Sequence, residues 1–317
     1  MTKHPMPSAK DGIRLRLGTR NSPLAMVQAE EVRDRLCATH HWNPDEVELV
    51  PVIASGDKVQ DRPLAEIGGK ALWTKELDQW LSDGRIDGAV HSAKDVETIR
   101  PAEFSFAAVL PRADRRDSLI GAPSIASLPQ GAKVGTSAPR RAAQLRNLRP
   151  DCEVVTFRGN VATRLAKLEA GEADATFLAA AGLSRLGMSE VGNPLPKAQW
   201  IAAAGQGAIV IEALSARAEA FAALSALDDE KTRGELKVER SLLAELGGTC
   251  HSPVAAECHW GDDQVSLRAA LFSADGSERV EAKLDFEKSD HAAPKRVARD
   301  LMDRASAAIL RNFNAPS

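Results

Sequence analysis

The chain repeats a strand, loop and helix unit, and this repeat constrains its fold more than any other feature of the sequence. In the first copy, residues 13–18 alternate apolar and basic side chains and lead through a Gly-Thr pair to Ser22 and Pro23. This is typical of a strand followed by a helix that Ser22 caps and whose first turn holds Pro23. In the second copy, residues 132–135 lead through another Gly-Thr pair to Pro139 and a helical stretch. The repetition predicts two similar α/β units.

A second pair of matching segments supports this prediction. Residues 84–90 and 171–178 each indicate a helix end, a tight turn and a buried strand that opens into a loop. We therefore expect one lobe near residues 12–109 and another near 113–204. Ligands of open α/β sheets bind outside the carboxyl ends of the strands, so two facing lobes would form a cleft.

The segment after the second lobe predicts that the chain returns to the first. Residues 208–214 are strand-like, and we assign residues 208–227 to the first lobe. The chain would then cross between the lobes twice, and the two crossings would form a hinge.

Residues 230–317 predict a small α+β domain. We expect a helix at about 232–246 and three strands, of which the last two alternate like half-buried antiparallel strands. A final helix with an apolar stripe from Val297 to Ile309 would cover the sheet. The strands are expected near residues 254–258, 265–271 and 280–286.

Charge and cysteine content exclude several classes of partner. The net charge of −3 gives no attraction to nucleic acid or an anionic membrane. Four cysteines, at positions 37, 152, 250 and 258, lack metal-ligand spacing, residues 1–11 lack an apolar signal core, and charged residues interrupt every long apolar run. We expect a cytoplasmic protein with free thiols, no metal, and no nucleic-acid or membrane partner.

Arginines fall repeatedly at strand ends and loop-to-helix junctions, where they would face the cleft. A planar guanidinium binds carboxylate or phosphate through two parallel hydrogen bonds, and helix N-termini add to the attraction. The pattern predicts a ligand with several negative groups, although each arginine alone is also explained as a solvated surface residue. The set is Arg20, Arg140, Arg141, Arg158 and Arg164.

Asp95 is the candidate for catalysis. It follows the apolar Ala89-Val90 strand within HSAKD, so it lies in the loop at the carboxyl end of that strand. A carboxylate among cations stays ionised, stabilises a developing positive charge and exchanges protons. The alternative is a structural aspartate that caps a turn or pairs with Lys94. We give His91 no catalytic role, because an imidazole at a strand end is more often a hydrogen-bonded core residue.

Cys250 is the candidate for attachment of a covalent group. It lies in LGGTCHSP, residues 246–253, directly after the predicted helix. Small residues leave the thiol in an open turn that a bulky adduct can approach. An unmodified loop thiol is the alternative that this cysteine alone leaves open.

A series of motifs runs in order through most of the chain, from about residue 13 to 258. They are 20–25 (RNSPLA), 68–70 (GGK) with 75–77 (KEL), 91–95 (HSAKD), 134–137 (VGTS), 158–164 (RGNVATR), 180–186 (AAGLSRL) and 205–207 (GQG). Together they resemble the porphobilinogen deaminase, or hydroxymethylbilane synthase, family.

The resemblance implies a transferase of tetrapyrrole and haem biosynthesis. Such an enzyme condenses four porphobilinogen molecules head to tail, releases ammonia at each step and frees hydroxymethylbilane by hydrolysis. The implied fold is α/β, with two periplasmic-binding-protein-like lobes of mixed sheets and a small α+β C-terminal domain with a three-stranded antiparallel sheet. The implied cofactor is a dipyrromethane bound through a thioether to Cys250, and the implied state is a monomer.

The resemblance also implies roles for individual residues. Asp95 would stabilise the cationic azafulvene left when ammonia departs. The acetate and propionate groups of the cofactor and of the growing polypyrrole would meet a cationic and polar lining. That lining would comprise Arg20, Ser22, Gln28, Lys70, Ser92, Lys94, Thr136, Arg140, Arg141, Arg158, Arg164 and Arg185.

The sequence departs from the family's pattern at four places. Glu97 replaces a usual proline, Pro139 replaces an aliphatic residue, and Thr249 replaces a glycine or serine. Glu66 occupies a position that is often basic, which puts in doubt a cationic contribution from a lid around residues 55–69.

Two other functions compete with this interpretation. A two-lobed small-anion binding protein without catalysis would share the architecture, but the absence of an export signal, the third domain and Cys250 argue against it. A phosphate-handling transferase would use similar arginines, but the sequence lacks a Gly-rich phosphate loop and an acidic metal cluster.

Overall fold

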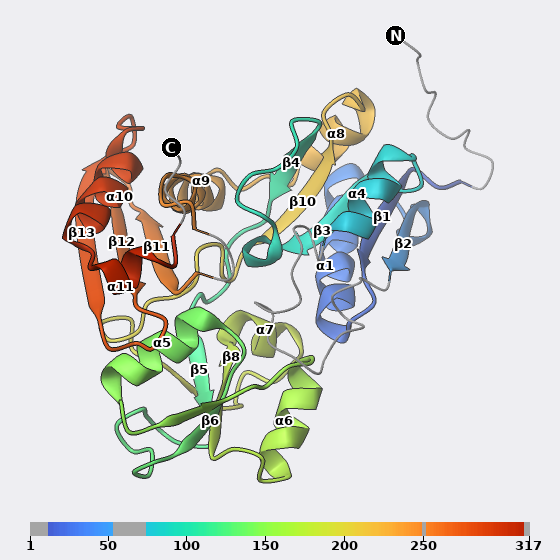
Figure 1. Cartoon of the computed structure of the whole chain (residues 1–317). Coiled ribbons are helices and arrows are strands. Elements are labelled where there is room, and N and C mark those ends of the chain that lie inside the picture. Colours follow the sequence, from blue (N-terminus) through green and yellow to red (C-terminus); the bar gives the residue numbers. More distant parts are fainter. Residues whose placement is uncertain (1–11, 53–73, 249–251, 314–317) are drawn as a thin grey trace.

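The computed structural model describes residues 12–52, 74–248 and 252–313, and these residues form three sheets (Figure 1). Two sheets have five strands each and the third has three. Helix α9 (Glu230–Glu245) packs against both the third sheet and strand β4 of the first. The predicted α/β class, with two lobes and a small α+β domain, is confirmed.

The first sheet takes strands from two distant parts of the chain. Its order is β2-β1-β3-β10-β4, with β1 parallel to β2 and β3, and with β10 antiparallel to β3 and β4. Ser22 caps α1 and Pro23 begins it, as the sequence predicted. The elements are β1 (Leu15–Arg20), α1 (Pro23–His40), η1 (Pro44–Glu46), β2 (Val47–Val52), α4 (Lys75–Ser82), β3 (Gly88–Ser92), η2 (Ala93–Asp95), β4 (Phe104–Val109), β10 (Ile209–Leu214) and α8 (Ala218–Ser225).

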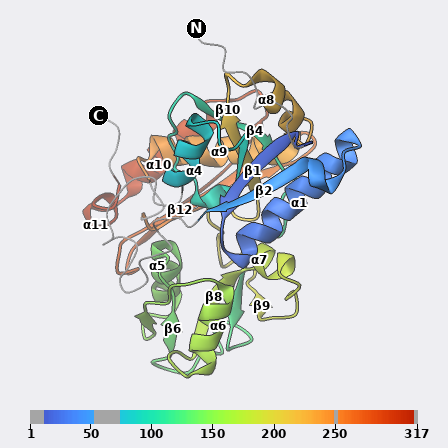
Figure 2. The same ribbon diagram turned by 90° about the vertical axis from the view of Figure 1, so that its right-hand side faces the viewer.

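The second sheet repeats this pattern. Its order is β7-β6-β8-β5-β9, with β6 parallel to β7 and β8, and with β5 antiparallel to β8 and β9. Helix α7 of this lobe packs against α1 of the first (Figure 2). The elements are β5 (Asp117–Ile120), β6 (Lys133–Gly135), α5 (Pro139–Leu148), β7 (Glu153–Val155), α6 (Val161–Glu169), β8 (Ala175–Ala179), α7 (Ala180–Arg185) and β9 (Asn193–Pro194).

Two crossings connect the lobes, through residues 110–116 and 195–208. They lie backbone to backbone, since the Ala113 amide donates to the Gly207 carbonyl at 3.2 Å. Gly207 has a φ of +87°, and a Cβ there would lie 2.6 Å from the Ala113 oxygen. Only glycine fits both the conformation and the space. These connections support a division into 12–109 with 208–227, 113–204 and 230–317, which we propose as the domains.

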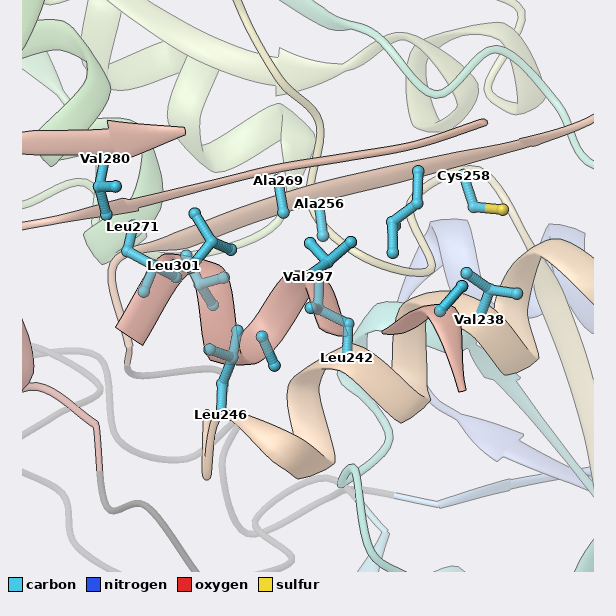
Figure 3. Close-up of a cluster of buried hydrophobic side chains, with 14 of the residues drawn as sticks. Val238, Leu242, Leu246, Ala256, Cys258, Ala269, Leu271, Val280, Val297 and Leu301 are labelled. Carbon is cyan, nitrogen blue, oxygen red and sulfur yellow. The ribbon is translucent and has the colours of Figure 1, made fainter. Parts of the chain in front are cut away.

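The third domain is an antiparallel sheet covered on one face by two helices (Figure 3). Side chains such as Leu242 of α9 and Leu301 of α10 (Ala293–Arg304) pack against its strands β11 (Val254–Trp260), β12 (Gln264–Phe272) and β13 (Arg279–Glu287). The sequence predicted only half-buried strands here. Instead Ala270 and Phe272 of β12 are fully buried in a cluster with Ala143 of α5, because the sheet docks on the second lobe.

The expected single C-terminal helix is wrong. Helix α10 ends at Arg304, Ala305 is extended, and a short helix α11 (Ala307–Leu310) follows. Ser306 causes the break, because its hydroxyl caps α11 by accepting a hydrogen bond from the Ile309 amide at 3.3 Å.

The carboxylate of Glu239, on α9, joins both crossings to the third domain. Glu239 is fully buried and pairs with Arg112 of the first crossing, with Nη1···Oε1 and Nη2···Oε2 distances of 2.9 Å each. It also accepts from the Gly205 amide of the second crossing at 2.7 Å and from the Cys258 amide of β11 at 2.9 Å. One charged group thus connects three segments that are distant in sequence.

We expect Glu239→Ala to destabilise the protein by about 3–5 kcal/mol, because it leaves the buried Arg112 guanidinium with Glu235 alone and the Gly205 and Cys258 amides without their acceptor. Unfolding in urea, followed by circular dichroism, measures the change. The matched control is Glu245→Ala on the same helix, whose carboxylate meets the exposed Lys295 at 3.7 Å; this change should stay within about 0.5 kcal/mol. Equal losses in the two variants would contradict the role of Glu239.

Candidate active site

The site is built at one edge of the first sheet. Strands β1 and β3 are parallel, so Arg20 and Ser92, their last residues, lie at the same edge. A single turn, η2, follows β3 at once and ends at Asp95. The amide of Ala93 is fixed by the Ala208 carbonyl at 3.0 Å, which ties this turn to the second crossing.

A cavity of about 50 Å³ lies at this edge. Gln28, which is buried on α1, donates from Nε2 to the Ser92 hydroxyl at 2.9 Å and so fixes one wall. Residues from β1, α1, β3 and η2 therefore surround one space, at the strand ends where the sequence predicted it. Its polar lining residues are Arg20, Ser22, Gln28, His91, Ser92 and Asp95.

Arg164 of the second lobe interacts electrostatically with Asp95. Burial lowers the pKa of Arg164 to about 10, the charges of Arg141 and Arg158 lower it further, and the Asp95 carboxylate opposes them. Arg164 donates from Nε to the Gly159 carbonyl at 3.0 Å, and it forms no ion pair with any carboxylate in the described part of the chain. Arg158 is buried nearby. The Asp95 side of the cleft thus meets positive charge from the opposite lobe.

Arg140 and Arg141 lie in the first turn of α5, and both bind Asp117, the first residue of β5. Arg140 Nη2 lies 2.8 Å from Asp117 Oδ2, and Arg141 Nη2 lies 2.7 Å from Oδ1. Trp200 Nε1 and Gln206 Nε2 donate to the same carboxylate at 2.7 and 2.8 Å. Burial alone would raise the pKa of Asp117, but the two guanidinium charges hold it well below its usual range. The arginines are therefore fixed by an internal anion.

Gln206 extends this network to the residue beside Asp95. Its Oε1 accepts from Lys94 Nζ at 3.2 Å, while its Nε2 binds Asp117. Burial lowers the pKa of Lys94 to about 8; the Asp95 carboxylate opposes this effect and Arg141 adds to it. One chain of contacts thus links η2 in the first lobe to β5 and α5 in the second.

The remaining predicted residues are not all brought to the cavity. Arg185 lies at the contact of α7 with α1, where its Nε meets Glu31 Oε2 at 3.3 Å and its Nη2 meets the Gly207 carbonyl at 3.2 Å. Thr136 is buried in the loop between β6 and α5, and its hydroxyl accepts from the Ala138 amide at 3.2 Å. Lys70 and Cys250, like the predicted lid at 55–69, lie outside the described residues.

His91 is neutral in this environment. Its side chain is buried, with Nε2 3.8 Å from Glu212 Oε2, and burial and the charge of Arg100 lower its pKa to about 4. A neutral imidazole keeps one ring N–H but supplies neither a positive charge nor an imidazolium proton at neutral pH. His91 Nε2 is buried without a hydrogen-bond partner in the described part of the chain, so the expectation of a hydrogen-bonded core residue is not met at this atom, and the exclusion of His91 from the catalytic set stays a prediction.

Asp117 and Gln206 are the main members of this contact network that the sequence analysis did not single out. Gln206 lies in the GQG motif, but its partners come from segments far away in the chain. For Asp117 the available signal was an aspartate placed directly before the apolar strand residues Leu119 and Ile120, next to two arginines.

Within the described ranges, no group of His, Cys, Asp or Glu side chains is placed to hold a metal ion. The helices of those ranges also include none that is long and apolar enough to cross a bilayer.

Two family models match the chain. Residues 15–222 match the dipyrromethane cofactor-binding domain of porphobilinogen deaminase, and residues 234–303 match the C-terminal domain of the same family. A porphobilinogen deaminase of Sphingopyxis alaskensis is 55% identical over 84% of this chain and 86% of its own length. One of Nitrobacter winogradskyi is 44% identical over 91% of this chain and 93% of its own. Among solved structures, immunogenic lipoprotein A of Vibrio vulnificus aligns with a TM-score of 0.42 and 12% identity, covering 69% of this chain and 96% of the lipoprotein.

The lowered pKa of Lys94 predicts a specific dependence of stability on pH. Because the pKa is about 8 in the folded protein and 10.5 ordinarily, the unfolded chain binds more protons between these values. The contribution of Lys94 to the free energy of unfolding therefore rises as pH increases from 8 to 10.5. The free energy of unfolding of Lys94→Met minus that of wild type should therefore be larger at pH 7 than at pH 10.

Urea unfolding at the two pH values measures this difference. Lys133→Met, at an exposed lysine, is the control and should show the same stability relative to wild type at both. A pH-independent effect of Lys94→Met would show that the charge of Lys94 is not disfavoured by folding.

Proposed function

The chain belongs to the porphobilinogen deaminase family, and on this premise we propose how its own residues carry the reaction. The activity is that of a hydroxymethylbilane synthase, a transferase of tetrapyrrole biosynthesis. Four porphobilinogen molecules are condensed head to tail with release of ammonia, and hydrolysis frees hydroxymethylbilane. When bound, the dipyrromethane cofactor supplies the primer to which the pyrrole units are joined.

The residues of the cleft fit a ligand that carries several carboxylates. Arg164 is the observation that supports this most directly, because it is a partly buried cation with no carboxylate partner in the described residues. A buried charge is costly unless a counter-charge meets it. The acetate and propionate groups of a dipyrromethane or of porphobilinogen would supply that counter-charge.

We propose that Asp95 is the catalytic residue. When ammonia leaves the aminomethyl group of porphobilinogen, positive charge develops on the substrate. A fixed carboxylate at the end of η2 stabilises that charge and accepts the proton released after the new carbon–carbon bond forms. Lys94 beside it and Arg164 of the opposite lobe interact electrostatically with this carboxylate.

The other members of the proposed set bind and orient carboxylates and pyrrole groups. Those that line the cavity with Asp95 are Arg20, Ser22, Gln28 and Ser92. Lys94, Arg140 and Arg141 are fixed through Gln206 and Asp117, so they present charge in defined positions. The proposal also includes Lys70, Thr136, Arg158, Arg164 and Arg185.

Cys250 is the proposed point of cofactor attachment, through a thioether. It falls between Gly248, whose amide binds the Leu243 carbonyl at 2.9 Å, and Ser252, whose hydroxyl donates to the Asn312 carbonyl at 3.0 Å. We further propose a monomeric, cytoplasmic enzyme whose ligands are porphobilinogen and the growing polypyrrole, with no nucleic-acid or membrane partner.

Intact mass spectrometry tests the attachment. The purified protein should carry the additional mass of a dipyrromethane, and Cys250→Ala should lack both this mass and turnover of porphobilinogen. Cys37→Ala, at a partly exposed cysteine of α1, is the control and should keep the adduct. Wild-type protein of unmodified mass that consumes no porphobilinogen would refute the proposed function.

Replacement of the proposed catalytic acid should separate binding from chemistry. We expect Asp95→Asn to fold and to keep its dipyrromethane, while kcat for porphobilinogen falls at least about 100-fold, because the amide cannot balance positive charge or take up a proton. Asp83→Asn, an exposed residue after α4, should turn over like wild type. Near-normal turnover by Asp95→Asn would assign Asp95 a structural role.

A further inference from the structure

The loop that follows Asp95 is held by an arginine of the third domain. Arg240, on α9, donates from Nη1 to the Val96 carbonyl at 3.3 Å, and from Nη2 to the Glu97 carbonyl and, at 2.8 Å, to the Thr98 carbonyl. Three successive carbonyls directly after the proposed catalytic residue thus converge on one guanidinium. A planar guanidinium has five N–H donors on three nitrogens and can hold carbonyls that lie apart. An ammonium presents its three donors from one atom.

Partial burial of the Arg240 guanidinium costs free energy, because the charge loses contact with water. Arg240 forms no ion pair within residues 12–52, 74–248 and 252–313. Its guanidinium lies 5.0 Å from the centre of the Phe106 ring. Burial lowers its pKa to about 10, so it remains charged at neutral pH. A partly buried cation that uses its hydrogen bonds to hold three successive backbone carbonyls indicates that the shape of this loop matters.

The same loop touches the segment that leads to Cys250. The Thr98 hydroxyl donates to the Gly248 carbonyl at 3.4 Å, and Gly248 stands two residues before Cys250 in sequence. The Gly248 amide in turn binds the Leu243 carbonyl at the end of α9. The last turns of α9 therefore contact the loop after Asp95 and also lead into the proposed attachment segment.

We propose that Arg240 is a positioning residue for the condensation, which holds the Asp95 loop in fixed register with the chain that Cys250 carries. This inference rests on the proposed roles of Asp95 and Cys250. Its physical basis is that a shift of about 1 Å in a reacting group lowers a rate by up to about 100-fold, so an acid on one domain and a primer on another need a rigid connection.

A second arginine of α9, Arg233, allows positioning of the loop after Asp95 to be distinguished from simple docking of the helix on the first lobe. Arg233 also reaches the first lobe, where its Nη2 donates to the Phe106 and Ala107 carbonyls at 3.2 and 3.1 Å. It pairs with Asp228 as well, at 2.6 Å. Arg233 therefore docks α9 on β4 without touching the loop after Asp95, and it serves as the matched control.

The experiment compares Arg240→Lys and Arg233→Lys as cofactor-loaded enzymes. Lysine keeps the positive charge, but its three donors lie on a single nitrogen, so it cannot reproduce the separate Nη1 and Nη2 contacts of Arg240. For Arg240→Lys we expect a kcat at least about tenfold below wild type, a KM for porphobilinogen within about twofold, and a full dipyrromethane mass. For Arg233→Lys we expect a kcat within about twofold of wild type.

Equal kcat values in Arg240→Lys and wild type, or equal losses in both lysine variants, would overturn the inference. If Arg240→Lys does not fold, Thr98→Val removes only the contact with Gly248. It should lower kcat about threefold at unchanged KM, and an unchanged kcat would overturn the inference. Failure of the proposed function is a different outcome, since wild-type protein would then lack the dipyrromethane mass and turnover.

Discussion

The buried carboxylate of Glu239 is the interaction on which the arrangement of the three domains depends. It pairs with Arg112 in the first crossing, binds the Gly205 amide in the second and binds the Cys258 amide of β11. A charge removed from water is tolerated only where such partners surround it. Because those partners come from three segments, the carboxylate fixes where the crossings lie relative to the third domain.

A second buried anion, Asp117, organises the charges of the cleft. It binds Arg140 and Arg141 and, through Gln206, is connected to Lys94 beside Asp95. Cations that are already fixed and partly removed from water attract carboxylates more strongly than solvated ones, and they do not have to be reoriented when a ligand arrives. Under the proposed function, this internal negative group would prepare the cleft for anions, because it compensates part of the positive charge and fixes the geometry of the arginines.

The sequence predicted those parts of the structure that depend on local patterns. The repeated strand, loop and helix units, the return of residues 208–214 as a strand and the place of Asp95 at a strand end all follow from periodicity and turn chemistry. The partners of Arg140 and Arg141 could not be predicted in this way, because Asp117 and Gln206 lie in separate segments. Burial of Ala270 could not be predicted, because the residues that cover it belong to the second lobe. The continuous apolar stripe predicted one C-terminal helix, but the helix breaks where Ser306 caps α11. The roles of the site residues stay predictions.

Strand β10 has a consequence for synthesis of the protein on the ribosome. It lies between β3 and β4, yet it is encoded after the whole second lobe. The nascent first lobe would expose the unpaired edges of β3 and β4 until Ile209–Leu214 emerges, whereas the second lobe has all its strands in one continuous stretch. The lobe that is translated first is therefore the one that finishes folding later, and it is the one that nascent-chain binding factors would need to shield.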